Sequence, residues 1–163
     1  MPGMHNHATP AAVMLWLLRE RSGKAQVLLQ HRHNVKVLND RWDAAACGRL
    51  EQGESAMQAV CREAAEELGI RIAPEDLRFA GLGHILIRPG FTYFNIYFEA
   101  LRWQGEPRIA EPDKCDGLMW FDVDALPEDM IPERRQALLG HLAGTRYHEA
   151  GFLDEQTKAT NGL

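Results

Sequence analysis

Three glutamates within a short stretch could together bind a divalent cation. Glu63 and Glu66 are spaced i, i+3 and Glu63 and Glu67 i, i+4, so on a helix their carboxylates crowd one region of the surface. Like charges at this spacing cost roughly 0.2–0.5 kcal/mol per pair. Mg²⁺ prefers oxygen ligands and often takes one or two carboxylates together with substrate phosphates. The spacing is therefore typical of a magnesium site, although Arg62 could also make it a solvated, salt-bridged helix face.

The glutamates belong to a longer pattern over residues 48–70, which reads GRLEQGESAMQAVCREAAEELGI. Gly48 is followed six positions later by Glu54, and eight positions after that come Arg62 and Glu63. Seven fixed identities at fixed spacing should match a given window by chance on the order of once in 10⁸. A solvated helix face does not require such a pattern, so the pattern favours chemistry.

This stretch resembles the Nudix box, Gly-x5-Glu-x7-Arg-Glu-apolar-x-Glu-Glu-x-Gly-apolar, with every position filled. The resemblance implies a MutT-like pyrophosphohydrolase, which cleaves a diphosphate linkage in a nucleoside diphosphate derivative by water attack. The implied cofactor is Mg²⁺, with Mn²⁺ as an alternative. The metals would neutralise pyrophosphate charge, lower the pKa of bound water and align in-line attack.

The resemblance also assigns roles, position by position. It makes Glu63, Glu66 and Glu67 metal ligands and adds the backbone carbonyl of Cys47, just before the box. Glu63 would in addition orient or deprotonate the water. Two further residues complete the catalytic group: Arg62, which would orient a carboxylate, and Glu54, which would support the loop or an outer-shell water.

Residues 111–132, EPDKCDGLMWFDVDALPEDMIP, resemble a stretch of Nudix enzymes that act on purine nucleoside triphosphates. Glu111 is the best candidate there for a further metal ligand, although acidic residues in such a segment also cap surface turns. Phe94 and Trp120 could stack on a base or belong to the core, and Arg32 could contact phosphate or simply solvate the surface. We expect a (deoxy)nucleoside triphosphate substrate, damaged purines included, that yields a monophosphate and pyrophosphate. ADP-ribose or a nucleotide sugar is the alternative.

Two rival functions remain open. Residues 46–55, ACGRLEQGES, are similar to the region around the catalytic cysteine of isopentenyl diphosphate isomerase, which would make Cys47 reactive. That enzyme's pattern favours a histidine where this chain has Arg49, and it typically lacks the intact Arg-Glu-x-x-Glu-Glu helix. The other rival is a non-enzymatic nucleotide-binding module, but such modules usually lose box carboxylates.

Composition limits the remaining function classes. The 163 residues favour one domain, 1–163, with tails at about 1–9 and 155–163 that we expect to be mobile. The net charge of −5 does not suit general nucleic-acid binding. Three cysteines without a CxxC spacing predict a reducing, cytoplasmic compartment. The apolar run 11–18 is too short to span a membrane, so no membrane partner is expected. A homodimer is left open.

Periodicity predicts an α/β fold that can position these residues. The expected elements are strands at 11–18 and 26–31, a turn at 21–24, a strand at 44–50, a helix at 54–68, a hairpin of 77–88 and 91–103, a strand at 118–123 and a closing helix at 132–146. Ser55 is the expected N-cap of the first helix and Gly69 its C-cap. This order, and the Nudix resemblance, indicate an α/β/α sandwich with a mixed sheet between helices.

Overall fold

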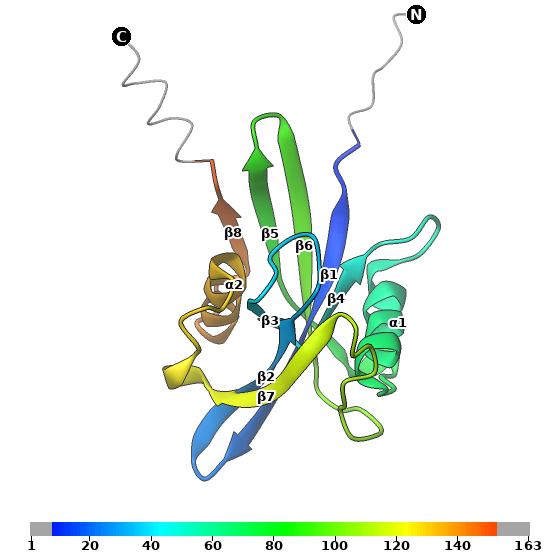
Figure 1. Cartoon of the computed structure of the whole chain (residues 1–163), viewed down its shortest axis with the longest axis vertical. Helices are drawn as coiled ribbons and strands as arrows, with labels where there is room; N and C mark the ends of the chain where they lie inside the picture. The colour runs from blue at the N-terminus through cyan, green and yellow to red at the C-terminus, as the bar shows by residue number, and fades with distance from the viewer. Residues whose placement is uncertain (1–7, 153–163) are drawn as a thin grey trace, which may run out of the picture.

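The computed structural model describes residues 8–152, and Figure 1 shows them as a twisted group of strands with a helix on either side. The strands are β1 (Ala11–Arg21), β2 (Lys24–Arg32), β3 (Trp42–Ala44), β4 (Ala46–Arg49), β5 (Leu77–Arg88), β6 (Phe91–Ala100), β7 (Cys115–Asp122) and β8 (Tyr147–Ala150). The helices are α1 (Ala56–Leu68) and α2 (Pro132–Leu142), with short 3-10 turns at Pro74–Asp76 and Val123–Ala125. The strand order is β3-β2-β1-β6-β5-β8, while β4 pairs with β1 and β7 with β2. Because β1 runs parallel to β6 and β5 parallel to β8, the sheet is mixed, as predicted.

The central strand β1 is buried on both faces, and its alternate side chains belong to two different halves of the core. Val13, Leu15 and Leu17 pack with the apolar face of α1, which contributes Ala59, Val60, Ala64 and Leu68. The intervening Ala12, Met14 and Trp16 pack instead with residues of α2, including Ala137 and Leu138. Successive strand side chains point to opposite faces, so one strand serves both layers. The α/β/α sandwich is confirmed.

Helix α1 is fixed in place by its two ends. Ser55 is extended, with φ −77° and ψ 158°, and its hydroxyl accepts a hydrogen bond from the Gln58 amide while the Gln58 side chain accepts one from the Ser55 amide. Such a reciprocal box satisfies two N-terminal amides at once. Gly69 ends the helix in the left-handed region, at φ 66°. Both expected caps are confirmed, and the extended cap residue explains why α1 begins at Ala56 rather than at position 54.

Two of the expected elements need correction, and one strand lies where none was expected. The strand predicted at 44–50 is two strands, because the chain leaves β2 after β3 and pairs with β1 in β4. The helix predicted at 132–146 ends at Leu142, and Gly144, at φ 83°, turns the chain away from it. The residues that follow form β8, a strand whose short, polar sequence YHEA gives little periodic signal.

The remaining boundaries shift by a few residues. The hairpin strand predicted at 91–103 ends at Ala100, and the strand predicted at 118–123 runs from Cys115 to Asp122. Of the expected tails, only residues 8 and 9 lie within the described range; 1–7 and 153–163 lie outside it. In the described range, neither helix has the length and apolarity needed to cross a membrane.

Candidate active site

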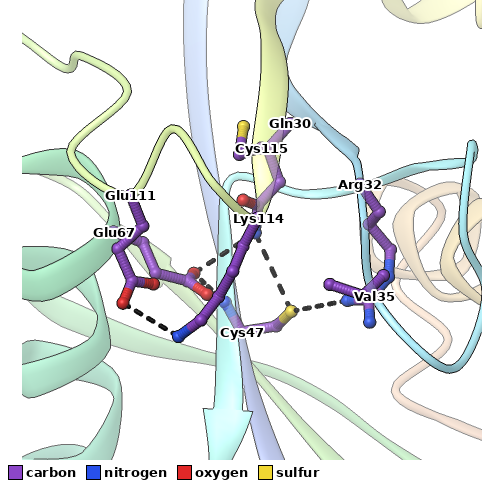
Figure 2. A pocket seen from close by; sticks show the side chains of 8 residues that line it. All are labelled: Gln30, Arg32, Val35, Cys47, Glu67, Glu111, Lys114 and Cys115. Carbon is purple, nitrogen blue, oxygen red and sulfur yellow. Dashed lines mark hydrogen bonds and ion pairs between the residues drawn. The ribbon is translucent and has the colours of Figure 1, made fainter.

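The predicted ligand region borders a small cavity of about 160 Å³, between α1 and the ends of β2 and β4 (Figure 2). It is lined by Gln30, Arg32, Val35, Cys47, Glu67, Glu111, Lys114 and Cys115. The lining contains two of the predicted metal ligands on separate segments, Glu67 of α1 and Glu111 of the segment before β7. It also contains Cys47, whose carbonyl is a third.

The carboxylate of Glu67 lies partly buried between α1 and β4. The Cys47 amide donates a 2.8 Å hydrogen bond to Glu67 Oε2, and the Gln30 side-chain amide donates to the same oxygen at 3.2 Å. Burial nevertheless raises the pKa of Glu67 to about 8, because its effect exceeds the lowering by the Cys47 hydrogen bond, and the charges of Glu63 and Asp43 also raise the pKa. The site therefore holds a carboxylate whose negative charge is not compensated by the protein alone.

Arg62 ties together the other acidic residues of the box. Its Nε and Nη2 donate to the two oxygens of Glu54 at 2.8 and 3.0 Å, a paired geometry that fixes both side chains. Its Nη1 donates to Glu63 at 2.7 Å and to Glu66 at 3.3 Å. The guanidinium lowers the pKa of Glu54, which also accepts a hydrogen bond from the Glu51 amide. Glu54 thus anchors Arg62, and Arg62 holds the carboxylate of Glu63, while the catalytic roles assigned to these residues stay predictions.

Gly48 lies directly against the carboxylate of Glu63. A Cβ atom at position 48 would overlap the Glu63 carboxylate, so only glycine leaves room for it. Burial raises the pKa of Glu63, and the charges of Glu66 and Glu111 raise it further against the opposing effect of Arg62. The close approach explains, from the structure, the glycine at the first position of the box.

A divalent cation fits the chemistry of these groups. The charge of Glu111 raises the pKa of Glu63, the charge of Glu63 raises the pKa of Glu67, and Lys114 in the cavity lining donates to Glu111 at 3.0 Å. Within residues 8–152, no three acidic, histidine or cysteine side chains already surround one point as a bound ion would require. Glu63 and Glu66 turn instead to Arg62, so metal binding requires rotamer changes of these two side chains.

The Cys47 carbonyl is on the correct side of its strand. The Leu50 amide donates to the Ala11 carbonyl, so positions 48 and 46 of β4 bond to β1 and the alternate position 47 does not. The Cys47 amide instead donates to Glu67, and the carbonyl of a strand residue points to the same side as its amide. The carbonyl therefore faces the side on which Glu67 lies, and its role as a metal ligand stays a prediction.

A family model for the NUDIX domain matches residues 8–140 of the chain. The chain belongs to the Nudix family. A Bacillus subtilis protein, provisionally named an 8-oxo-dGTP diphosphatase, is 32% identical over 69% of this chain and 68% of its own length. An uncharacterized Nudix hydrolase of Clostridium acetobutylicum is 28% identical over 68% of this chain, and the match spans 56% of that relative. The crystal structure of a MutT NUDIX hydrolase from Burkholderia pseudomallei superposes with a TM-score of 0.70 at 28% identity, covering 82% of this chain and 98% of that one.

The residues predicted to bind substrate are not brought together at this Nudix site. Arg32 lines the cavity, but its guanidinium already donates to Asp43, Cys47 and two backbone carbonyls. Trp120 lies on β7 under the guanidinium of Arg19, 4.1 Å from the ring centre, and packs against the core beneath α1. Phe94 stacks on His84 with ring centroids 4.4 Å apart. Neither aromatic ring lines the cavity, so base stacking by them stays a prediction.

Sequence reasoning missed four polar residues around the Nudix glutamates. Gln30 donates to Glu67, and Lys114 pairs with Glu111. The buried carboxylate of Asp43 binds Arg134 of α2 at 2.7 Å. Gln30 directly follows the apolar run Val27–Leu29, and nothing in the sequence distinguishes it there from a surface residue at a strand end. Asp43 and Arg134 are far apart in sequence, and neither belongs to a motif, so no local signal pairs them.

Proposed function

We propose that this protein hydrolyses a diphosphate linkage in a nucleoside diphosphate derivative, with Mg²⁺ as cofactor and Mn²⁺ as an alternative. The observation that carries the proposal is Glu67, a carboxylate that burial and Glu63 keep at a pKa of about 8 on the wall of a cavity. A structural carboxylate is normally paired or exposed, because burying an uncompensated charge is costly. A cation shared with substrate phosphates would supply the missing charge.

In this proposal Glu63, Glu66 and Glu67 bind the metal together with the Cys47 carbonyl and Glu111. The bound metal would neutralise phosphate charge and lower the pKa of the attacking water. Glu63 is the proposed base that orients or deprotonates this water, since it lies on the same helix as the other ligands. Its contact with Arg62, which Glu54 anchors, holds the Glu63 side chain in one orientation until the metal binds.

We propose a (deoxy)nucleoside triphosphate as the substrate, with damaged purines included, and a monophosphate and pyrophosphate as products. The name of the Bacillus subtilis relative supports this choice. ADP-ribose or a nucleotide sugar is the second choice. We further propose that the enzyme works in the cytoplasm on small nucleotides rather than on nucleic acid, which its net charge of −5 supports.

The test is product release with Mg²⁺ across a substrate panel. The panel holds nucleoside triphosphates, oxidised purine triphosphates, ADP-ribose, nucleotide sugars and dinucleoside polyphosphates. Pyrophosphate from a triphosphate supports the proposal and identifies the base. Monophosphates from ADP-ribose or a sugar nucleotide keep the hydrolytic chemistry and replace the substrate class. If no member of the panel yields a product, the result contradicts the proposal.

One observation favours a second candidate, an isopentenyl diphosphate isomerase-like reaction. The Cys47 side chain lines the cavity beside Glu67, and burial together with the charges of Asp43 and Glu67 raises the pKa of the Cys47 thiol. A thiol that stays protonated beside a diphosphate site could serve as an acid. Cys47→Ala separates the two functions: it should leave hydrolysis within about threefold of wild type, whereas it would abolish isomerisation of isopentenyl diphosphate.

The third candidate, a nucleotide-binding module without activity, has less support from the site. All four box glutamates are present, and three of them contact Arg62. Substrate turnover in the panel excludes a purely binding role, while tight nucleotide binding without turnover would support one.

A further inference from the structure

The fully buried side chain of Asp43 joins several elements beneath the cavity. Its Oδ1 accepts a 2.7 Å hydrogen bond from Arg134 of α2, and its Oδ2 accepts one of 3.1 Å from Arg32 at the end of β2. The thiol of Cys47 donates to the same Oδ2 at 3.5 Å. Asp43 has no exposed surface, and the two guanidinium groups hold its pKa below the ordinary value despite burial. One carboxylate thus connects α2, β2, β3 and β4.

Arg32 extends this connection to the segment between β2 and β3, residues 33–41, which we name the wall loop. The Arg32 Nε donates to the Leu38 carbonyl at 3.2 Å, and its Nη2 donates to the Val37 carbonyl at 3.0 Å. Backbone hydrogen bonds between positions 32 and 41 and between 40 and 32 close the base of the loop. Val35 of the wall loop and Arg32 both line the cavity (Figure 2).

The wall loop holds little of its conformation by itself. Asn34, Leu38 and Asp40 all have positive φ, near 53°, which is unfavourable for non-glycine residues and most of all for leucine. Burial does not compensate, since Val37 is 65% and Leu38 44% exposed. Inside the loop, Asn39 accepts a hydrogen bond from the Val35 amide. Backbone hydrogen bonds hold the two ends of the wall loop, including one of 2.9 Å from the His33 amide to the Lys114 carbonyl. The Arg32 guanidinium holds its middle, through the carbonyls of Val37 and Leu38.

We propose that Asp43 is a positioning residue for substrate binding: it fixes Arg32, and Arg32 holds the wall loop in place as one side of the cavity. Arg134 anchors the opposite oxygen of Asp43, so the geometry depends on α2 as well. Arg32 then acts by shaping the cavity and need not contact phosphate. The inference rests on the proposed function only in taking the cavity as the substrate site.

Two substitutions test the chain of contacts at different points. Asp43→Asn replaces a charged acceptor by an amide whose NH₂ must face one of the guanidinium groups. Arg32→Lys keeps the positive charge but cannot reach Asp43 and two carbonyls at once, because it lacks the planar fork. The matched controls are Asp122→Asn, which removes a surface carboxylate that accepts from Lys24 and Gln26, and Arg102→Lys, which alters an exposed pair with Asp76.

The first readout is amide hydrogen exchange of the protein without substrate. Both variants should raise exchange in the wall loop at least about tenfold and leave α1 unchanged, as expected when hydrogen bonds from a charged donor are lost. The double variant should be no worse in the wall loop than the single variants, because the two residues act as one unit. The controls should leave the wall loop as in wild type.

The second readout is kinetic, on whichever panel substrate is hydrolysed. KM should rise about tenfold while kcat changes less than about threefold, the pattern of lost binding without lost chemistry. Unchanged wall-loop exchange, or an equal rise across α1, would overturn the inference. If Asp43→Asn fails to fold because Arg134 loses its partner, Arg32→Lys decides, since it leaves that pair intact. If the wild-type protein hydrolyses no member of the panel, the proposed function fails. Hydrogen exchange then still decides whether Asp43, through Arg32, holds the wall loop in place.

Discussion

The amide of Cys47 on β4 donates a 2.8 Å hydrogen bond to the Glu67 carboxylate on α1. This contact joins the residue that directly precedes the box to the last glutamate within it. It also sets the Cys47 carbonyl on the same side as the Glu67 oxygens. Two predicted ligands of different chemical kinds are thus brought together by one backbone hydrogen bond.

Replacing Glu67 by glutamine tests the ligand assignment. Glu67→Gln keeps the shape and can still accept from Cys47 and Gln30, but it removes the ligand charge. We expect kcat to fall on the order of a hundredfold or more, since even outer partners of metal ligands cost 10–100-fold. The folded state should be no less stable, because the amide avoids burying a charge. Steady-state kinetics and thermal unfolding check both points, with exposed Glu75→Gln as control. A fully active Glu67→Gln enzyme would refute the assignment.

Metal binding should release protons near neutral pH. In the metal-free protein the pKa of Glu67 is about 8, so at pH 7 this carboxyl is mostly protonated. A metal ligand must be deprotonated, so Mg²⁺ should displace about one proton at pH 7 and almost none at pH 9.5. Calorimetry in buffers of different ionisation enthalpy measures this number. Proton release that persists unchanged in Glu67→Gln would assign it to another group.

The same shift predicts how stability depends on pH. The folded-state pKa of Glu67 lies above the ordinary value of 4.5, so its contribution to stability is complete below pH 4.5 and is lost as pH rises to about 8. Mg²⁺ stabilises the folded state in proportion to its binding, which requires the ionised carboxylate. The rise in Tm on adding Mg²⁺ should therefore be larger at pH 8.5 than at pH 5.5. An equal rise in Tm at both pH values would contradict the raised pKa of Glu67.

The box helix could be predicted almost to the residue, and the contacts around it could not. Ser55, Gly69 and the apolar positions of α1 carry local signals, because caps and helical periodicity act over a few residues. Residues 44–50 are split because β3 pairs with β2 whereas β4 pairs with β1. The local sequence does not determine which strands pair across the sheet. β8 forms because β5 offers a free edge, a property that the sequence YHEA does not contain.

The contacts of the site likewise include some that the sequence implies and others that only the folded chain brings about. Arg62 lies within four positions of Glu63 and Glu66 and eight positions after Glu54, so the motif alone implies their contact. Asp43 and Arg134 are 91 positions apart, and only the packing of α2 against the sheet brings them within 2.7 Å. Arg32 shows the cost of lacking that information. Its type suggested phosphate binding, while the structure commits its donors to Asp43 and the wall loop.

Gly48→Ala tests the geometry of the proposed base without changing any charged group. The added methyl would overlap the Glu63 carboxylate, which must swing away while the β4 backbone stays paired with β1. Because the displaced atoms are the end of a side chain, Tm should change little. We expect kcat to fall about 100-fold, within the range that positioned acid–base groups contribute.

The informative comparison is with Glu63→Gln and with the double variant. If Gly48→Ala acts only by displacing Glu63, it should cost little further activity in a Glu63→Gln background, because residues that act as one unit are not additive. Steady-state kinetics of the four proteins form the cycle. Additive losses would mean that Gly48 supports activity by another route, and that the contact between position 48 and Glu63 is structural rather than catalytic.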